Sequence, residues 1–278
     1  MTEITNLADL IVNAREISGR TDFNEYVNTR PFEKAVKALA SCTQLDRELA
    51  ESIENYIKEN VINERELCFV LFTTVYTIYR KNKTANVYEY MCLHKSDFCD
   101  YEFFSFLDIM AEYNAFKDDK SKYRIIKKAK ALTDKEIFKN HNGVINLYVE
   151  AVCEYFEANL EEREDNGVFL EDAKEKITAL IKKAEEKYAK FHLNLGRLEA
   201  LLSNYNLAES HIREAIGMIE AGKMHVYEVG EYEQYLMKVN MIKLYDQNDE
   251  KIKEVERIKT DNLKSMSLIT AQIGRAHF

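Results

Sequence analysis

One short segment of the sequence collects side chains that could bind a metal ion. Cys92, His94 and Cys99 lie within one stretch of eight residues. A structural zinc site uses four Cys or His ligands, commonly with a Cys-x-x-Cys pair. This segment offers three ligands and no such pair. We therefore interpret it as a chance cluster at the end of a helix and predict no metal site.

The motifs that usually carry catalysis are missing from the sequence. It contains no Gly-rich phosphate loop, no dinucleotide-binding fingerprint, no His-Glu-x-x-His and no Gly-x-Ser-x-Gly. These motifs supply backbone donors, metal ligands or an exposed nucleophile, and no other residues replace them. We expect no catalytic residues and no cofactor. An enzyme with an unfamiliar helical active site is kept as an alternative.

Composition predicts the elements that must position any site. The 278 residues include one proline and eight glycines, with 46% hydrophobic and 31% charged residues. So few turn-forming residues favour long helices over a sandwich or barrel. The net charge of −9 argues against a nucleic-acid partner, which needs a basic face. Five cysteines without regular spacing favour a reducing cytoplasm over a disulfide framework.

The clearest helical pattern covers residues 189–220. It predicts two amphipathic helices joined by a turn near Ser203-Asn204. Gly196 in the first helix, and Ala208 and Ala215 in the second, put small residues where the helices face each other. We expect a close antiparallel approach, with large apolar residues such as Ile212 filling the seam.

This pattern resembles a tetratricopeptide repeat, in which Gly, Ala, a large apolar residue and Ala recur at these spacings. The resemblance implies an array of helical hairpins whose first helices line a concave peptide-binding groove. His192 falls where the family usually has a large aromatic residue, so we interpret it as a packing residue, and His211 as facing solvent. The positions that match the groove are Lys190, Leu193, Asn194, Arg197, Ala200 and Leu201.

Four of these residues are our candidate peptide-binding site: Lys190, Asn194, Arg197 and Leu201. The polar three follow each other at steps of four and three, so they share one helix face. They could hold a peptide carboxylate or backbone by charge-assisted hydrogen bonds. The alternative is that they are ordinary exposed polar residues.

The fold expected from the whole chain is all-α, an array of antiparallel helical hairpins like a tetratricopeptide α-solenoid. Residues 1–140 form its irregular half, in which 63–83 is a buried helix, with a strand as the minority interpretation, and Ser121 caps a later helix. Residues 141–248 hold tetratricopeptide-like repeats, including a degenerate one interrupted by an acidic loop at 161–172, and a capping helix at 227–245. Residues 249–278 form a charged helical tail with a weak stripe of Ile252, Val255 and Ile258.

The function expected from this organisation is a non-catalytic scaffold that binds a protein or peptide. A peptide-sensing regulator of bacterial transcription or signalling is the alternative, although residues 1–60 show no convincing helix-turn-helix. The chain turns apolar from Met266 to Ala271. We therefore expect a cytoplasmic protein, attached to a membrane only if the native chain continues past Ala271 into an apolar span of about 20 residues.

Overall fold

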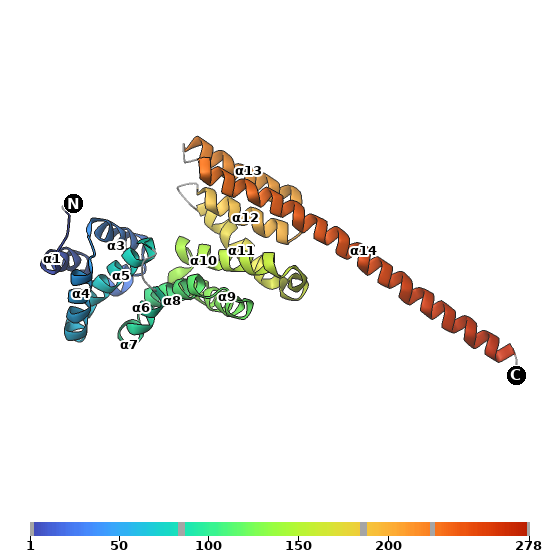
Figure 1. Ribbon diagram of the computed structural model, residues 1–278, viewed down its shortest axis with the longest axis horizontal. Helices are drawn as coiled ribbons and strands as arrows, with labels where there is room; N and C mark the ends of the chain where they lie inside the picture. Colours follow the sequence, from blue (N-terminus) through green and yellow to red (C-terminus); the bar gives the residue numbers. More distant parts are fainter. Residues whose placement is uncertain (1–2, 83–86, 184–187, 223–225, 277–278) are drawn as a thin grey trace. The chain divides into compact units, whose positions relative to one another are not determined.

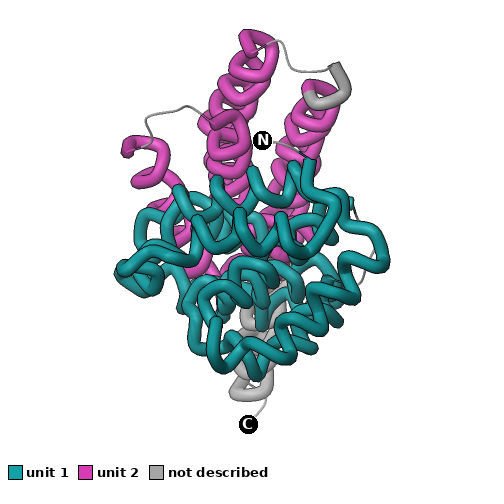
Figure 2. Tube along the Cα trace, turned by 90° about the vertical axis from the view of Figure 1, so that its left-hand side faces the viewer, with its two compact units in different colours: residues 1–151 teal, residues 152–278 magenta. Residues whose placement is uncertain are grey.

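The chain is all-α, as its composition predicts. The computed structural model describes residues 3–82, 87–183, 188–222 and 226–276, and in the last helix it describes the side chains of 229–254 and 257. Within those ranges the regular elements are helices, and the one β-type pairing is an isolated bridge between Ile4 and Thr43. The helices form two compact units, residues 1–151 and 152–278 (Figure 2).

The first unit is built from short and medium helices (Figure 1). In chain order they are α1 (Leu7–Ser18), α2 (Phe23–Tyr26), α3 (Arg30–Cys42), α4 (Arg47–Asn60), α5 (Arg65–Asn82), α6 (Val87–Leu93), α7 (Lys95–Phe98), α8 (Glu102–Ala115), α9 (Asp119–Thr133) and the 3-10 helix η1 (Glu136–Phe138). Helix α10 (Asn142–Ala158) begins in this unit and runs across the boundary between the two.

Helix α5 is the centre of the first unit, with α1, α3, α4 and α6 packed against it. Its residues 67–76 are all buried, and Phe69 stacks on Tyr101 with ring centroids 4.3 Å apart. The helical interpretation of 63–83 is confirmed over Arg65–Asn82, residues 63 and 64 lie before the helix, and the strand alternative is wrong. The hydroxyls of Thr73 and Thr74 donate to carbonyls one turn back, so these β-branched residues are satisfied inside a buried helix.

Helices α1, α3, α4 and α9 begin with a side chain that caps the first turn, and the predicted cap of α9 needs a correction. Asp118, and not Ser121, caps α9, because the Asp118 carboxylate accepts a hydrogen bond from the Ser121 backbone N–H at 2.9 Å. Ser121 is therefore the third residue of the helix. Both residue types are good caps. The side-chain hydrogen bond decides in favour of the aspartate.

The second unit continues with η2 (Leu160–Glu162), α11 (Arg163–Lys183), α12 (Ala189–Leu201), α13 (Tyr205–Ala221) and α14 (Val226–Ala276). The acidic loop predicted at 161–172 is wrong, because these residues belong to η2 and α11. Leu170 is buried, which holds this stretch against the unit. The irregularity that remains is a kink at Asn166, whose φ of −120° is not helical.

Helices α12 and α13 form the predicted hairpin, and their close approach at Gly196 is confirmed. A Cβ atom on Gly196 would lie 2.7 Å from a side-chain carbon of Ile212 and 2.9 Å from the carbonyl oxygen of Ala208. Only glycine therefore fits there without a shift of α13. The hairpin turns at Ser203, whose φ of 62° is left-handed.

Helix α14 is much longer than the capping helix predicted at 227–245. It has 51 residues, against 17 in α13, and Figure 1 shows it continuing past the hairpin. Its first half packs on α13 and α12 and buries Val239 and Ile242. Among the described residues, no helix combines the length and the apolar character that crossing a membrane requires.

Candidate interaction surface

The four residues predicted to line a peptide groove all lie on α12, but three of them are buried. Asn194, Arg197 and Leu201 are 0%, 5% and 2% exposed, whereas Lys190 is exposed. The alternative considered from the sequence, ordinary exposed polar residues, therefore describes Lys190 alone. Whether any of the four contacts a ligand stays a prediction.

The Arg197 guanidinium is already bound within the unit. It donates to both carboxylate oxygens of Glu157 on α10, at 2.6 and 3.1 Å, and to the Asn194 side-chain oxygen at 3.2 Å. The ring of Tyr235 on α14 lies 4.9 Å from its central carbon. Burial disfavours the charged form, but the hydrogen bonds and negative charge of Glu157 outweigh it and raise the pKa of Arg197. A peptide carboxylate would have to displace Glu157 to bind here.

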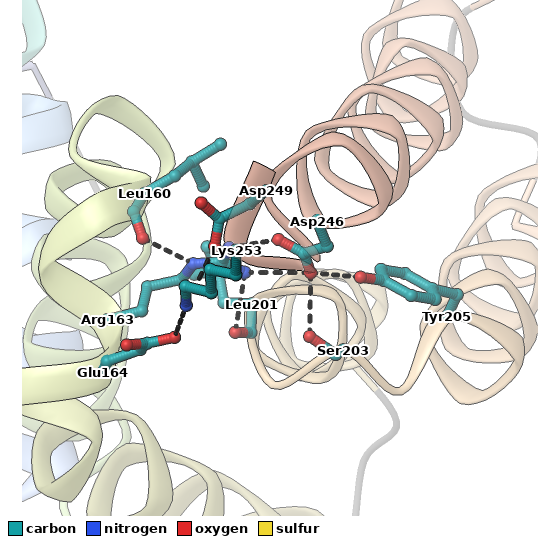
Figure 3. Close-up of polar contacts among 9 residues, drawn as sticks. All are labelled: Leu160, Arg163, Glu164, Leu201, Ser203, Tyr205, Asp246, Asp249 and Lys253. Carbon is teal, nitrogen blue, oxygen red and sulfur yellow. Dashed lines mark hydrogen bonds and ion pairs between the residues drawn. The ribbon is translucent and has the colours of Figure 1, made fainter. Parts of the chain in front are cut away.

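Asp246 on α14 joins three parts of the second unit through its carboxylate (Figure 3). It accepts from Arg163 at the start of α11, from the Ser203 hydroxyl in the hairpin turn at 2.8 Å, and from the hydroxyl of Tyr205 on α13. Partial burial would raise the pKa of Asp246, but these hydrogen bonds and the Arg163 charge lower it below its ordinary value.

Two further ion pairs fix the rotation of α14 about its own axis. Lys238 contacts Glu157 at 3.2 Å, about two turns before Asp246, and Lys253 pairs with Glu164 about two turns after it. Figure 3 places Lys253 and Asp246 on the side of α14 that faces Arg163 and Glu164. These contacts determine which face of α14 meets the rest of the unit and which face is left uncovered.

The uncovered face of α14 carries a stripe of large apolar side chains, which we call the α14 stripe: Met237, Met241, Leu244 and Ile252. Each of them is 57–68% exposed. At about 3.6 residues per turn these positions, together with Asn248, share one side of the helix, opposite Val239 and Asp246. An exposed apolar strip of this kind, interrupted here by Asn248, commonly marks a protein-binding surface.

The sequence contains a signal for this surface that the predicted helix boundaries obscured. The sequence pattern places the weak stripe of Ile252, Val255 and Ile258 in a tail and predicts that the preceding helix ends at Tyr245. The stripe was therefore divided between two predicted elements. Met237, Met241 and Leu244 continue the same spacing toward the N-terminus without a proline between them. Following the spacing through Tyr245 would have indicated one long amphipathic helix.

Comparison of the chain with protein-family models, with curated proteins and with solved structures finds no match.

Proposed function

We propose that this protein is a non-catalytic helical scaffold that binds protein through the α14 stripe. The observation that carries the proposal is the exposure of Met237, Met241, Leu244 and Ile252 on a helix whose other side is fixed to its unit. Burying such side chains releases roughly 1.5–3 kcal/mol each. Methionine side chains also adapt to varied partners. The stripe is narrow and straight, which suits another helix better than a flexible peptide.

The partner that fits best is a second copy of this chain, with the two α14 helices parallel. The sequence of α14 can be placed in a heptad register in which five of eight a and d positions are apolar, and these positions form the seam of a coiled coil. The a positions are Met241, Asn248, Val255 and Asn262, and the d positions are Met237, Leu244, Lys251 and Ile258. Asparagine at position a is typical of parallel pairs with a fixed register.

Charge complementarity supports the parallel arrangement. In the same register Glu254 occupies position g and Lys259 the next position e. A parallel pair brings position g of one helix beside the following position e of the other, so this pairing forms twice in a symmetric dimer. In an antiparallel pair, position g of one helix lies beside position g of the other, which would place the two Glu254 residues on the same side of the pair. Helix α14, about 75 Å long at 1.5 Å per residue, is long enough for several heptads.

The α12–α13 hairpin is, in this proposal, a tetratricopeptide-like unit that supports α14. Its support is the close approach at Gly196 and the packing of Ala208 and Ile212, the same small and large positions that carry the sequence resemblance. In this arrangement α14 packs on the hairpin as a capping helix does in a repeat array.

Sedimentation velocity over a range of protein concentrations tests the proposal. We expect the wild-type chain to dimerise and the double variant Met241→Glu, Leu244→Glu to stay monomeric, because paired charges in the seam repel. The control places the same two charges on the exposed side of α13, with Asn206→Glu and Ser210→Glu, and should dimerise normally. A wild-type chain that is monomeric at about 100 μM, which limits the free energy of dimerisation to less than about 5.5 kcal/mol, would overturn self-association.

Disulfide cross-linking tests the parallel register. In a parallel dimer the two copies of position 248 face each other, so Asn248→Cys should form a disulfide-linked dimer under mild oxidation. Glu250→Cys, on another side of the helix, should not. Cys92→Ser and Cys99→Ser serve as the background for both variants, because both native cysteines are exposed. Equal cross-linking at 248 and 250 would contradict the proposed seam.

A further inference from the structure

Three potential metal ligands converge between α12 and α13. Nδ1 of His192 lies 3.1 Å from Oε2 of Glu214, and Nδ1 of His211 lies 3.9 Å from the same oxygen. One ligand atom from each of the three side chains can be chosen so that all lie within 4.8 Å of one another. The two imidazole rings are 6.0 Å apart between centroids.

The hairpin itself brings these side chains together. His211 and Glu214 are three residues apart on α13 and therefore project from the same face. His192 comes from α12, four residues before Gly196, where the two helices approach most closely. The backbone that holds the three groups is thus fixed by a contact that tolerates no additional side-chain atom. A site on two packed helices is better preorganised than a site on a loop.

The polar atoms of this cluster are only partly satisfied. Nδ1 of His211 is buried and has no hydrogen-bond partner among the described residues, and its 3.9 Å distance from Glu214 is too long for a hydrogen bond. Nδ1 of His192 and Nδ1 of His211 both face the same oxygen of Glu214, at 3.1 and 3.9 Å, without forming a hydrogen bond to it. A cation bound among the three would give both ring nitrogens and the carboxylate a common partner.

We propose that His192, His211 and Glu214 bind a divalent transition-metal ion, with Zn²⁺ as the best-fitting candidate. Zinc takes imidazole nitrogens at about 2.0–2.1 Å and carboxylate oxygens at about 2.0–2.2 Å, which puts neighbouring ligand atoms about 3.3 Å apart in a tetrahedron. The ligand atoms, which lie within 4.8 Å of one another, would have to move closer by side-chain rotation to reach that geometry. Two imidazoles with one carboxylate suit Zn²⁺, and all-oxygen sets suit Mg²⁺ or Ca²⁺.

The exposure of the ligands predicts an accessible site with an open position. His192 is buried, whereas the side chains of His211 and Glu214 are 26% and 45% exposed. An ion can therefore enter from solvent on the Glu214 side. Three protein ligands leave the fourth tetrahedral position for water. The family resemblance predicted that His192 is a packing residue, and the sequence predicted that His211 faces solvent. The structure brings the two rings together.

Co²⁺ titration of the chelator-treated, full-length protein tests the site, with visible absorption as the readout. We expect one equivalent of Co²⁺ to bind and Zn²⁺ to displace it. Loss of a direct ligand should weaken Co²⁺ binding by more than about tenfold, the lower end of the cost for outer-shell partners. His211→Gln and Glu214→Gln are the test variants, and Glu220→Gln, an exposed glutamate on the same helix, is the matched control.

Two further measurements distinguish this site from metal binding elsewhere in the chain and from loss of the fold. Far-UV circular dichroism establishes that the variants are folded, so that a lost signal reports a lost ligand. A strong thiolate charge-transfer band that disappears in Cys92→Ser would place the ion at the exposed cysteines and overturn the proposal. Unchanged Co²⁺ affinity in both His211→Gln and Glu214→Gln, or no binding by the wild-type chain, would overturn it equally.

Discussion

At the scale of single residues, Arg197 shows that a polar residue whose helical spacing predicts a binding surface can instead form an ion pair in the interior of a unit. Its side chain is buried, its two-point contact with Glu157 joins α12 to α10, and Lys238 adds a contact from α14 to the same carboxylate. A buried ion pair stabilises a protein little more than an apolar pair of equal volume would. Removing one partner alone leaves a buried charge, which is costly.

A double-mutant cycle tests this account of Arg197. Arg197→Met alone should lower the free energy of unfolding by about 3 kcal/mol, because Lys238 is then the one ionic partner of Glu157 among the described residues. Arg197→Met combined with Glu157→Gln should recover part of that loss, since no unpaired carboxylate remains. Chemical denaturation of the four proteins measures both effects. A double variant that is less stable than Arg197→Met alone would contradict the account.

Asp246 predicts a dependence of stability on pH. Its pKa is lowered in the folded chain, so the unfolded chain binds the proton more readily. The contribution of Asp246 to stability is therefore complete above its unfolded pKa of about 4 and is lost as pH falls through the lower folded value. Asp246→Asn should cost about 1–2 kcal/mol at pH 7 through weakened hydrogen bonds to Arg163 and Tyr205.

Thermal unfolding of both proteins between pH 7 and pH 2.5 measures this effect. The wild-type chain should lose more stability than Asp246→Asn over the acidic part of that range, so the two curves should converge. Ser203→Ala, which removes one neutral donor to the same carboxylate, is the control and should keep most of the wild-type pH dependence. Parallel curves for wild type and Asp246→Asn would contradict the role of the carboxylate.

At the scale of the elements, the sequence predicted those features that depend on local rules. The all-α class followed from the scarcity of glycine and proline, and the hairpin at 189–220 followed from the spacing of small residues. The prediction of an acidic loop at 161–172 was wrong because it relied on charge alone, which indicates exposure to solvent. Arg163 instead contacts Asp246, and Leu170 is buried, so both residues attach this stretch to the unit. The burial of Arg197 depends on Glu157 and Tyr235, which lie 40 and 38 positions away in the sequence. The spacing of residues within α12 cannot predict contacts with residues so far away in the sequence.

At the two glycines of the hairpin, substitution by alanine is expected to change the stability of the chain in opposite directions. Gly196→Ala should destabilise the chain by about 1–3 kcal/mol, because the new methyl group would overlap Ile212 and the backbone of Ala208. Gly217→Ala, at an exposed position of α13 with no atom within 4 Å of the added carbon, should stabilise it by about 0.5–1 kcal/mol. Urea denaturation of the two variants measures the sign of each change in the free energy of unfolding. A stabilising Gly196→Ala would rule out the close approach of the helices.

At the scale of the whole molecule, the α14 stripe links the stability of the chain to its concentration. If α14 pairs with a second copy and the dimer is the more stable form, mass action makes the midpoint of thermal unfolding rise with protein concentration. A tenfold increase should raise it by a few degrees for a chain of this size. The variant Met241→Glu, Leu244→Glu, which keeps the buried face of α14 but loses the seam, should unfold at the same temperature at every concentration. Scanning calorimetry over a hundredfold range of concentration distinguishes the two behaviours. A wild-type midpoint that does not move would mean that the stripe is covered by a different protein or by none.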